Sequence, residues 1–565
     1  MSQTSLDPNV PVSLDSLKAA GLSFDSARQV LDVYDRVLDA AKASLRDRVV
    51  IDGKLNGGKL EELESEAHAL SMIAIYREGA REMIDFGERM QAKGDSGALE
   101  AAQAHAFVGI AARELLGAID LGTAEKVVPQ DLGIGDELLD ELRQGETGAY
   151  VRQAASTGLI AQIARRIHEV GHFGDSGLDD EMLLMIRDQF RKFVDQEVVP
   201  IAHDIHLKDT LIPMSIIQTM AEMGVFGLTI PEEYGGAGLG KLAMVLVTEE
   251  LSRGYIGVGS IGTRAEIAAE LILGGGTEEQ KQKWLPGIAA GEVLPTAVFT
   301  EPSNGSDLAH LKTRAEKVDG GYRITGQKTW ITHASRADVM TILARTDASE
   351  PGYRGLSMFL GEKPRVEGDV KTFQSEGLEA SELPVLGYRG MKEYELSFDG
   401  FFVPEENLLG GEEGNGFKQL MRTFESARIQ TAARAVGVAQ SALEVGYQYA
   451  NERNQFGKPI WEFPRVFGKI GRLSVLIQAA RQLTFFSARQ KDSEKRCDLE
   501  AGMAKLYAGW IAWQAADAAL QIHGGNGFSM EFPISRILCD ARVLSIFEGA
   551  AEIQAHVIAR RVLES

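Results

Sequence analysis

The stretch Tyr322-Arg323-Ile324-Thr325-Gly326-Gln327-Lys328-Thr329-Trp330-Ile331-Thr332 decides the fold class, because here helical periodicity gives way to short runs of β-branched and aromatic residues. The turn Asp319-Gly320-Gly321 directly before it is typical of a β-hairpin. Similar runs follow at residues 339–343, 356–360 and 394–398. Strands this short, joined by turns without intervening helices, predict a small β-sandwich or barrel over residues 294–405.

Helical patterns lie on both sides of this β region. Residues 178–293 begin with an apolar stripe at the 3.6-residue period, and residues 416–565 contain three long helical runs and one shorter run, the number expected for a four-helix bundle. Residues 1–150 are also helical in pattern but carry no recognisable chemistry, so we expect a docking or dimer-supporting module there. The predicted fold is mainly α with a central β domain and an N-terminal helical extension.

The amino-acid composition limits the kinds of partner that the protein is expected to bind. The 565 residues include 59 basic and 81 acidic side chains, and the formal net charge of -22 disfavours binding to nucleic acid or to an anionic membrane. Two cysteines cannot make a disulfide framework, no run of about 18 apolar residues could cross a bilayer, and the N-terminus lacks a leader pattern. We therefore expect a cytoplasmic protein. No metal-ligand spacing, nucleotide-binding glycine motif or hydrolase signature occurs.

A candidate general base lies near the C-terminus, in Ser545-Ile546-Phe547-Glu548-Gly549-Ala550-Ala551-Glu552-Ile553-Gln554. Glu548 stands between apolar side chains and directly before a glycine. A poorly hydrated carboxylate has a raised proton affinity, which suits a base that works near neutral pH. Glu-Gly pairs are also common in plain turns, so this stretch alone does not establish catalysis.

Four other segments suit a ligand that combines a flat ring with phosphates. Residues 299–307 and 521–528 are rich in turns and glycines, which lets backbone N–H groups approach an anion. Trp330 and Thr332 are two residues apart on a strand, so alternation predicts an indole and a hydroxyl on the same face. Residues 453–460 supply a cation and an aromatic ring between two helices. Each segment alone is more typical of a turn or a helix cap, and their joint order is the informative feature.

Together these motifs resemble the acyl-CoA dehydrogenase family. TEP-x-x-GSD, W-I-T, R-x-x-F-G-x-P, Q-x-x-GG-x-G and EG-x-x-x-IQ occur in the family's order, and the resemblance covers residues 178–565. It implies a helical domain, a β domain and a four-helix bundle, with FAD between the last two. It also implies α,β-dehydrogenation of an acyl-CoA thioester, with electrons passed to electron-transfer flavoprotein.

The resemblance also assigns the catalytic role. Glu548 would remove the pro-R α-proton of the thioester while the β-hydrogen leaves as hydride to flavin N5. The enolate oxygen would be held by the Glu548 N–H and a flavin ribityl hydroxyl. Some family members carry the base on the first bundle helix, at the position of Ala427 here, which leaves Glu548 as the candidate of the two.

Cofactor and substrate contacts are carried over position by position. The resemblance implies that four residues contact the isoalloxazine or the pyrophosphate of FAD: Thr300, Thr332, Trp330 and Ser306. The adenine and pyrophosphate of FAD in a neighbouring subunit would meet Arg453, Phe456, Gln521 and Gly525, with Glu552 as a further cofactor contact. A homodimer or homotetramer is therefore implied. The expected substrate contacts are Arg264, Glu425, Arg428 and Gly549.

Several positions depart from the family pattern. Ala550 replaces a threonine near the FAD phosphates, and Met391-Lys392-Glu393 replaces a Ser-Asp-Thr-like turn near the flavin edge. Glu393 could tune flavin access or electron transfer there, and an exposed turn residue is an equally good interpretation. Arg264 stands where members acting on plain fatty acids are apolar or small. A cation there suits a substrate with a second carboxylate. An ion pair between Arg264 and Glu266 or Glu270 would explain the arginine equally well.

The sequence thus favours an FAD-dependent dehydrogenase of a short branched dicarboxyl-CoA. A short or branched monocarboxyl acyl-CoA dehydrogenase and a glutaryl-CoA-type dehydrogenase are the alternatives within this class. A DNA-binding member of the same fold is a remote alternative, which the charge of -22 disfavours.

Overall fold

The computed structural model describes residues 6–122, 124–366, 373 and 375–565, which fall into two compact units. We call residues 1–184, 439–490 and 496–565 the extension–bundle unit, and residues 185–438 with 491–495 the sheet unit. The prediction of a mainly helical fold with a central β domain and an N-terminal helical extension is confirmed. Among the described residues, no helix has the length and apolar character needed to cross a membrane.

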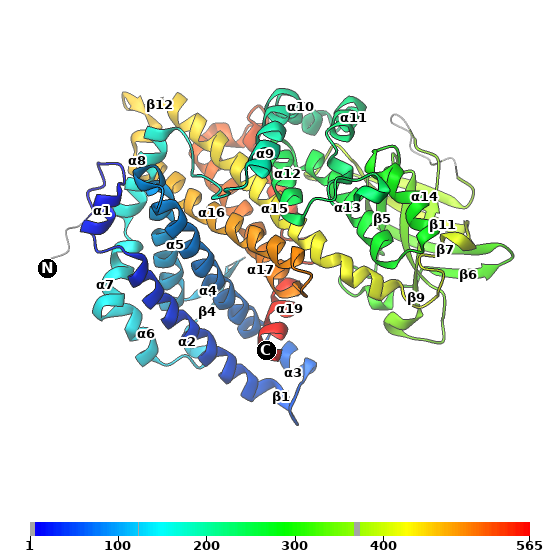
Figure 1. The fold of residues 1–565 in the computed structure, drawn as a ribbon, viewed down its shortest axis with the longest axis horizontal. Helices are drawn as coiled ribbons and strands as arrows, with labels where there is room; N and C mark the ends of the chain where they lie inside the picture. Colours follow the sequence, from blue (N-terminus) through cyan, green and yellow to red (C-terminus); the bar gives the residue numbers. More distant parts are fainter. Residues whose placement is uncertain (1–5, 123, 367–372, 374) are drawn as a thin grey trace. The chain divides into compact units, whose positions relative to one another are not determined.

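In the extension–bundle unit, N-terminal helices pack against C-terminal ones (Figure 1). α5 (Ala98–Leu116) is buried on nearly every side, and its many alanines let α4 (Glu64–Gln91) and α7 (Gly145–Ala154) pack closely against it. α4 also packs against α19 (Ala551–Glu564), where Ser71 Oγ donates to the Ala555 carbonyl at 2.7 Å. The N-terminal extension therefore shares a core with the helices that carry the C-terminal motifs.

The other helices of this unit are α1 (Leu14–Ala19), α2 (Phe24–Val49), α3 (Gly57–Glu61), α6 (Asp136–Arg143), α8 (Thr157–Val170), α16 (Pro464–Asp492), α17 (Asp498–His523) and α18 (Pro533–Val543). Its short strands form three two-stranded hairpins: β1 (Val50–Ile51) with β2 (Lys54–Leu55), β3 (Ile119–Gly122) with β4 (Glu125–Val127), and β12 (Asn454–Gln455) with β13 (Lys458–Pro459). α15 (Gly416–Glu452) begins in the sheet unit and ends in this one.

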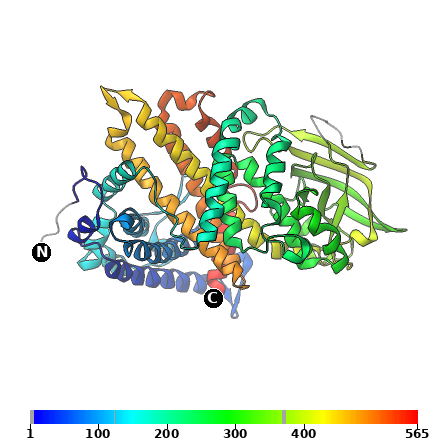
Figure 2. The same ribbon diagram turned by 45° about the horizontal axis from the view of Figure 1, so that its top comes forward.

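The sheet unit is built around one seven-stranded sheet, with the strand order β10-β11-β7-β6-β8-β5 and β9 paired with β8. Its strands are β5 (Pro295–Val298), β6 (Arg314–Val318), β7 (Gly321–Thr332), β8 (Val339–Arg345), β9 (Leu356–Glu362), β10 (Leu378–Leu383) and β11 (Glu393–Pro404). Figure 2 shows its strands from a second direction. The helices of this unit are α10 (Val199–Lys208), α11 (Met214–Glu222), α12 (Lys241–Gly254), α13 (Ile256–Gly275) and α14 (Glu278–Ala289), while α9 (Glu181–Phe193) begins in the extension–bundle unit and ends in this one.

The predicted hairpin at Asp319-Gly320-Gly321 is confirmed, since Val318 pairs with Gly321 across β6 and β7 and Gly320 has a φ of +76°. The stretch from Tyr322 to Thr332 lies within the single strand β7. Its pairing with β11 shifts register between Tyr394 and Leu396, which is a β-bulge opposite Thr329 and Trp330. This irregularity lies in the W-I-T motif and alters how its side chains point.

Candidate active site

Glu548 lies in the turn between α18 and α19, in the extension–bundle unit. The Ala551 N–H donates to the Ser545 carbonyl at 3.0 Å and closes this turn. Glu548 is half-buried and has a φ of +52°, a left-handed conformation that costs a non-glycine residue about 1–3 kcal/mol. Such strain persists only where the surroundings hold the backbone, and it is concentrated at functional sites.

Two buried side chains, from Gln554 and Lys505, lie against the turn. Gly549 has a φ of +94°, and a Cβ there would lie 1.9 Å from Gln554 Nε2, so a side chain at this position meets both strain and a clash. Gln554 itself is fully buried. On the other side, the buried Lys505 of α17 donates from Nζ to the Gly549 carbonyl at 2.5 Å. The base is therefore carried on a turn fixed by α17 and by the first turns of α19.

Replacing Lys505 with methionine is expected to lower kcat by about 10- to 100-fold, because a small displacement of a catalytic group has effects of this size. Methionine fills much of the same volume, so the fold is expected to persist. Steady-state kinetics with Lys505→Arg, which retains a donor, should show partial recovery. Lys59→Met on the exposed helix α3 is the matched control. An unchanged kcat in Lys505→Met would show that the turn is held without this contact.

Glu552 lies in the first turn of α19 and is exposed. Its charge acts on His68 of α4: burial lowers the pKa of that imidazole, and Glu552 opposes the decrease. This predicted cofactor contact therefore lies beside a helix of the N-terminal extension, which the motif comparison did not anticipate.

The residues predicted to hold adenine and pyrophosphate come from two loops of the extension–bundle unit. Arg453 and Phe456 belong to the β12–β13 hairpin after α15, while Gln521 and Gly525 lie at the end of α17. Tyr449 links the loops, since its ring stacks on His523 with centroids 4.2 Å apart and its hydroxyl accepts from Asn526 Nδ2 at 3.0 Å. The structure thus brings these two segments together.

The loop of Thr300 is fixed in the sheet unit by a buried ion pair. Lys328 is 0% exposed, and its Nζ lies 3.1 Å from Glu301 Oε1 and 2.8 Å from the Phe299 carbonyl. The N–H groups of Lys312 and Thr313 donate to the same carboxylate. Burial lowers the pKa of Lys328 to about 8, opposed by Glu301, so the pair is largely ionised at neutral pH. Thr300 accepts from the Thr329 N–H at 2.9 Å, and this ties the loop to β7.

Replacing Lys328 with methionine is expected to destabilise the protein by about 3–5 kcal/mol, because Glu301 keeps its burial but loses its cation. The melting temperature and the FAD content after purification should both fall. The double variant Lys328→Met/Glu301→Gln should recover part of the stability, since it leaves no uncompensated charge. Equal losses in the single and double variants would contradict this explanation.

The sequence predicts that the side chains of Trp330 and Thr332 lie on the same face of a regular strand, and the structure departs from this regular alternation. Trp330 has a φ of +58° and is 58% exposed, whereas Thr332 is buried. The bulge against β11 and the left-handed Trp330 together interrupt the pleat. Thr332 Oγ1 donates to Glu393 Oε2 at 3.1 Å across the strands. The predicted stacking surface is open, and the predicted hydroxyl lies beside Glu393. This carboxyl is buried at the start of β11, so the alternative of an exposed turn residue is wrong.

Ser306 lies on an exposed loop with Gly305, where a Cβ would meet nothing within 4 Å. This leaves room for a phosphate to approach the backbone. Exposed aromatic rings mark the other predicted cofactor positions: Phe456 is 92% exposed and Trp330 58%. Large apolar rings beside hydroxyls and open glycine backbone are what a dinucleotide flavin would cover. Within each unit, taken by itself, the predicted residues therefore suit contact with part of FAD.

On the substrate side, Arg264 lies on α13 and is buried. The two carboxylates considered as its partners both engage Lys241 of α12: the Nζ pairs with Glu266 and lies 2.5 Å from Glu270 Oε1. Thr229 also donates to Glu266, and Ser426 Oγ donates to Glu270 at 2.5 Å. Burial raises the pKa of Glu393 to about 7, and the positive charge of Arg264 is among the influences that oppose this rise.

Glu425 and Arg428, the other predicted substrate contacts in this unit, lie on α15 and are half-buried. Glu425 Oε2 accepts from Lys491 Nζ at 2.8 Å. Lys491 is therefore a cationic partner of Glu425 in the described structure. The role of Glu425 toward a substrate stays a prediction.

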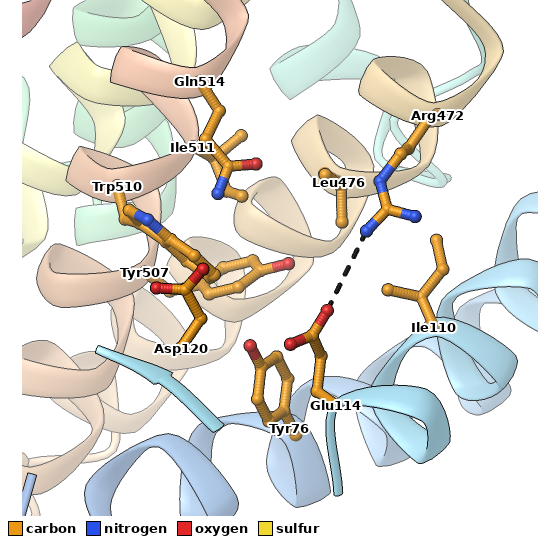
Figure 3. A pocket seen from close by; sticks show the side chains of 10 residues that line it. All are labelled: Tyr76, Ile110, Glu114, Asp120, Arg472, Leu476, Tyr507, Trp510, Ile511 and Gln514. Carbon is orange, nitrogen blue, oxygen red and sulfur yellow. Dashed lines mark ion pairs between the residues drawn. The ribbon is translucent and has the colours of Figure 1, made fainter. Parts of the chain in front are cut away.

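A separate cavity of about 100 Å³ lies in the extension–bundle unit between α4, α5, α16 and α17 (Figure 3). Tyr76 and Tyr507 line it, and Arg472 Nη2 lies 4.0 Å from Glu114 Oε1 at its edge. The buried tyrosine hydroxyls find no partner among the described residues, which suits a space with room for ordered water. None of the predicted site residues lines it.

Three family models match the chain: the acyl-CoA dehydrogenase N-terminal domain at residues 180–292, the middle domain at 296–401 and the C-terminal domain at 414–563. The chain belongs to the acyl-CoA dehydrogenase family. The (2S)-methylsuccinyl-CoA dehydrogenase of Cereibacter sphaeroides is 57% identical over 544 residues, which are 95% of this chain and 98% of that protein. This match includes the N-terminal extension, which the family models leave out.

Solved structures of acyl-CoA dehydrogenases are also similar to this chain. A glutaryl-coenzyme A dehydrogenase in complex with glutaryl-CoA is 35% identical with a TM-score of 0.63, covering 67% of this chain and 94% of that one. A glutaryl-CoA dehydrogenase from Mycobacterium smegmatis in complex with FADH2 is 26% identical with a TM-score of 0.62, covering 68% and 95%. This acyl-CoA dehydrogenase is an FAD-dependent oxidoreductase acting on an acyl-CoA, and the predicted family, enzyme class and cofactor are confirmed.

Sequence reasoning gave no role to Lys505 and Lys328, and it named Gln554 only as the last residue of a motif. Each is a polar side chain that is fully or almost fully buried in this acyl-CoA dehydrogenase. A lysine within the apolar run of α17, or inside a β-branched strand, was the available signal. The partner of Lys505 could not be predicted from the sequence, because Lys505 and Gly549 are 44 residues apart.

Proposed function

We propose that this acyl-CoA dehydrogenase converts (2S)-methylsuccinyl-CoA to mesaconyl-CoA, a reaction of the ethylmalonyl-CoA pathway. The observation that carries the proposal is the 57% identity to the (2S)-methylsuccinyl-CoA dehydrogenase of Cereibacter sphaeroides, which extends over the N-terminal helices as well as the family domains. The buried cation of Arg264 supports it, because a second carboxylate entering the protein interior needs such a partner.

In the proposed reaction Glu548 removes the α-proton of the thioester. The left-handed turn aims this carboxylate, and the hydrogen bond from Lys505 to the Gly549 carbonyl holds the turn. The Glu548 N–H stabilises the developing enolate oxygen, which is needed because an α-C–H is otherwise too weak an acid for a carboxylate. Bound FAD supplies the acceptor for the β-hydride.

Thr300, Thr332, Trp330 and Ser306 hold FAD in this proposal, with Arg453, Phe456, Gln521, Gly525 and Glu552 contacting the FAD of a neighbouring subunit. A homodimer or homotetramer follows, which light scattering coupled to size exclusion would measure. Because two electrons must leave after each turnover, we also propose electron-transfer flavoprotein as the acceptor. The cytoplasmic location stays a prediction that cell fractionation tests.

A substrate panel on the purified yellow protein tests the proposal. Dye reduction is expected to be fastest with (2S)-methylsuccinyl-CoA and much slower with 2-methylbutyryl-CoA, which has the branch but no second carboxylate. Glutaryl-CoA is the third substrate, and release of carbon dioxide would identify a glutaryl-CoA-type enzyme. Preference for 2-methylbutyryl-CoA would instead identify a monocarboxyl acyl-CoA dehydrogenase.

A further inference from the structure

The cavity in Figure 3 is lined by side chains from both parts of the chain that the extension–bundle unit brings together. Tyr76 of α4, Glu114 of α5 and Asp120 of β3 come from the N-terminal extension, while Arg472 of α16 and Tyr507 of α17 come from the bundle. The volume of about 100 Å³ is several times the roughly 10–15 Å³ that one water needs, and about two thirds of a cavity that holds benzene. The cavity therefore has room for a molecule of a few heavy atoms.

Two buried hydroxyls point into this cavity. Tyr76 is 2% exposed and Tyr507 is 1% exposed, and their rings meet edge to face with centroids 6.4 Å apart. Neither hydroxyl forms a hydrogen bond with the residues that the structure describes, and Figure 3 shows both oxygen atoms directed toward the same space. A buried hydroxyl without a hydrogen bond is costly, so each requires a partner inside the cavity.

The charged side chains around the cavity leave it with an excess of negative charge. Asp120 is oriented by the Gly122 N–H, which donates to its Oδ1 at 2.9 Å. Arg472 Nη2 lies 4.0 Å from Glu114 Oε1, which is beyond hydrogen-bond distance, and the arginine side chain is 51% exposed. Burial raises the pKa of Glu114, and Arg472 opposes the rise. One half-exposed guanidinium thus faces two carboxylates, so the lining favours a further positive charge.

We propose that this cavity binds a small organic cation with several N–H groups, of the size of a short primary alkylammonium ion. The N–H groups donate to the Glu114 carboxylate and to the two tyrosine oxygens, which supplies the hydrogen bonds that these groups lack. The side chains of Leu476 and Trp510 line the same space and suit the short alkyl part. A neutral molecule would leave the carboxylate charge uncompensated, and an anion would add to it.

Such a ligand would contact helices of the N-terminal extension and of the bundle at the same time. It would also touch α17, which carries Lys505 two residues before Tyr507. None of the residues predicted to contact FAD or acyl-CoA lines the cavity, so the inference does not depend on the proposed substrate. Because the ligand binds the folded protein alone, it should raise the melting temperature of the holoenzyme.

The test is a titration of the oxidised holoenzyme with ethylammonium chloride, followed by NMR of the ligand protons. Ethanol and acetate are the neutral and anionic molecules of similar size, and about 0.15 M salt screens binding to the acidic surface. We expect a Kd of about 1 mM for ethylammonium, which is near the limit for so few heavy atoms. Binding of ethanol should be at least about tenfold weaker, and acetate should show no saturable binding.

Two variants locate the site. Glu114→Gln should weaken ethylammonium binding by at least about tenfold, and Tyr507→Phe should weaken it several-fold. Because the Tyr507 hydroxyl has no partner among the described residues, Tyr507→Phe should keep the melting temperature of the ligand-free protein. Glu125→Gln, an exposed carboxylate of β4, is the matched control and should bind ethylammonium as the wild type does.

Ethylammonium that binds no better than ethanol to the wild-type protein would overturn this inference, and the cavity would then hold water alone. The same conclusion follows if the wild-type protein shows no saturable binding of ethylammonium. Since these comparisons need no variant, a folding defect in Glu114→Gln or Tyr507→Phe does not leave the question open. Unchanged binding in both folded variants would assign the cation to another site and would equally contradict the proposal.

Discussion

Replacing Glu548 with glutamine should nearly abolish reduction of bound FAD by (2S)-methylsuccinyl-CoA, with a loss of at least about 10³-fold in the rate. Glutamine has the same shape but cannot accept the α-proton at neutral pH. Anaerobic stopped-flow absorbance of the flavin measures this step directly. Full flavin reduction at the wild-type rate in Glu548→Gln would exclude Glu548 as the base.

The isosteric change also separates catalysis from folding. Because the turn is closed by backbone contacts and held through Gly549, the variant should keep its melting temperature and FAD content. Glu531→Gln, in an exposed position before α18, is the matched control and should keep the wild-type rate. A variant that loses FAD would instead assign Glu548 a role in binding the cofactor.

The second large effect is expected at Arg264. Arg264→Met should lower the ratio of kcat/KM for (2S)-methylsuccinyl-CoA over that for 2-methylbutyryl-CoA by about 100-fold or more. The reason is that losing one partner of a buried charge pair costs about 2–5 kcal/mol. Methionine keeps much of the buried volume, so the packing of α13 is expected to survive.

Dye-reduction kinetics with both substrates check this result. Lys208→Met on α10 is the control, since that lysine is exposed and pairs with Asp204 within its own helix. An unchanged ratio in Arg264→Met would mean that the second carboxylate is recognised elsewhere. Equal losses for both substrates would indicate damage to the pocket rather than loss of a specific contact.

Local pattern was sufficient for the fold class, as the region around β7 shows. Strand alternation, the Asp319-Gly320-Gly321 turn and the absence of helical periodicity are properties of neighbouring residues, and they predicted the β domain. The same reasoning was wrong about Trp330 and Thr332. A β-bulge depends on the partner strand β11, so no pattern within β7 alone reveals it.

The residues of the candidate site also fall into two groups: those that a sequence motif identifies and those that only the fold brings beside them. Glu548 was identified from its motif, yet the supports of its turn come from α17 and α19. Thr300 was singled out as a hydroxyl, while the buried pair of Lys328 and Glu301 that fixes its loop joins residues 27 positions apart. Such pairs depend on which segments meet, and a sequence without its fold does not specify them.

The sequence by itself determined the order of helical and β regions, the family, the cofactor and the candidate base, because each is encoded in short segments. It left open whether Arg264 serves a substrate or the nearby Glu266 and Glu270. Tertiary structure paired both of those carboxylates with Lys241 of α12, which no pattern around Arg264 reveals. The physical reason is that a buried charge is governed by the few groups around it in space, where water no longer screens them.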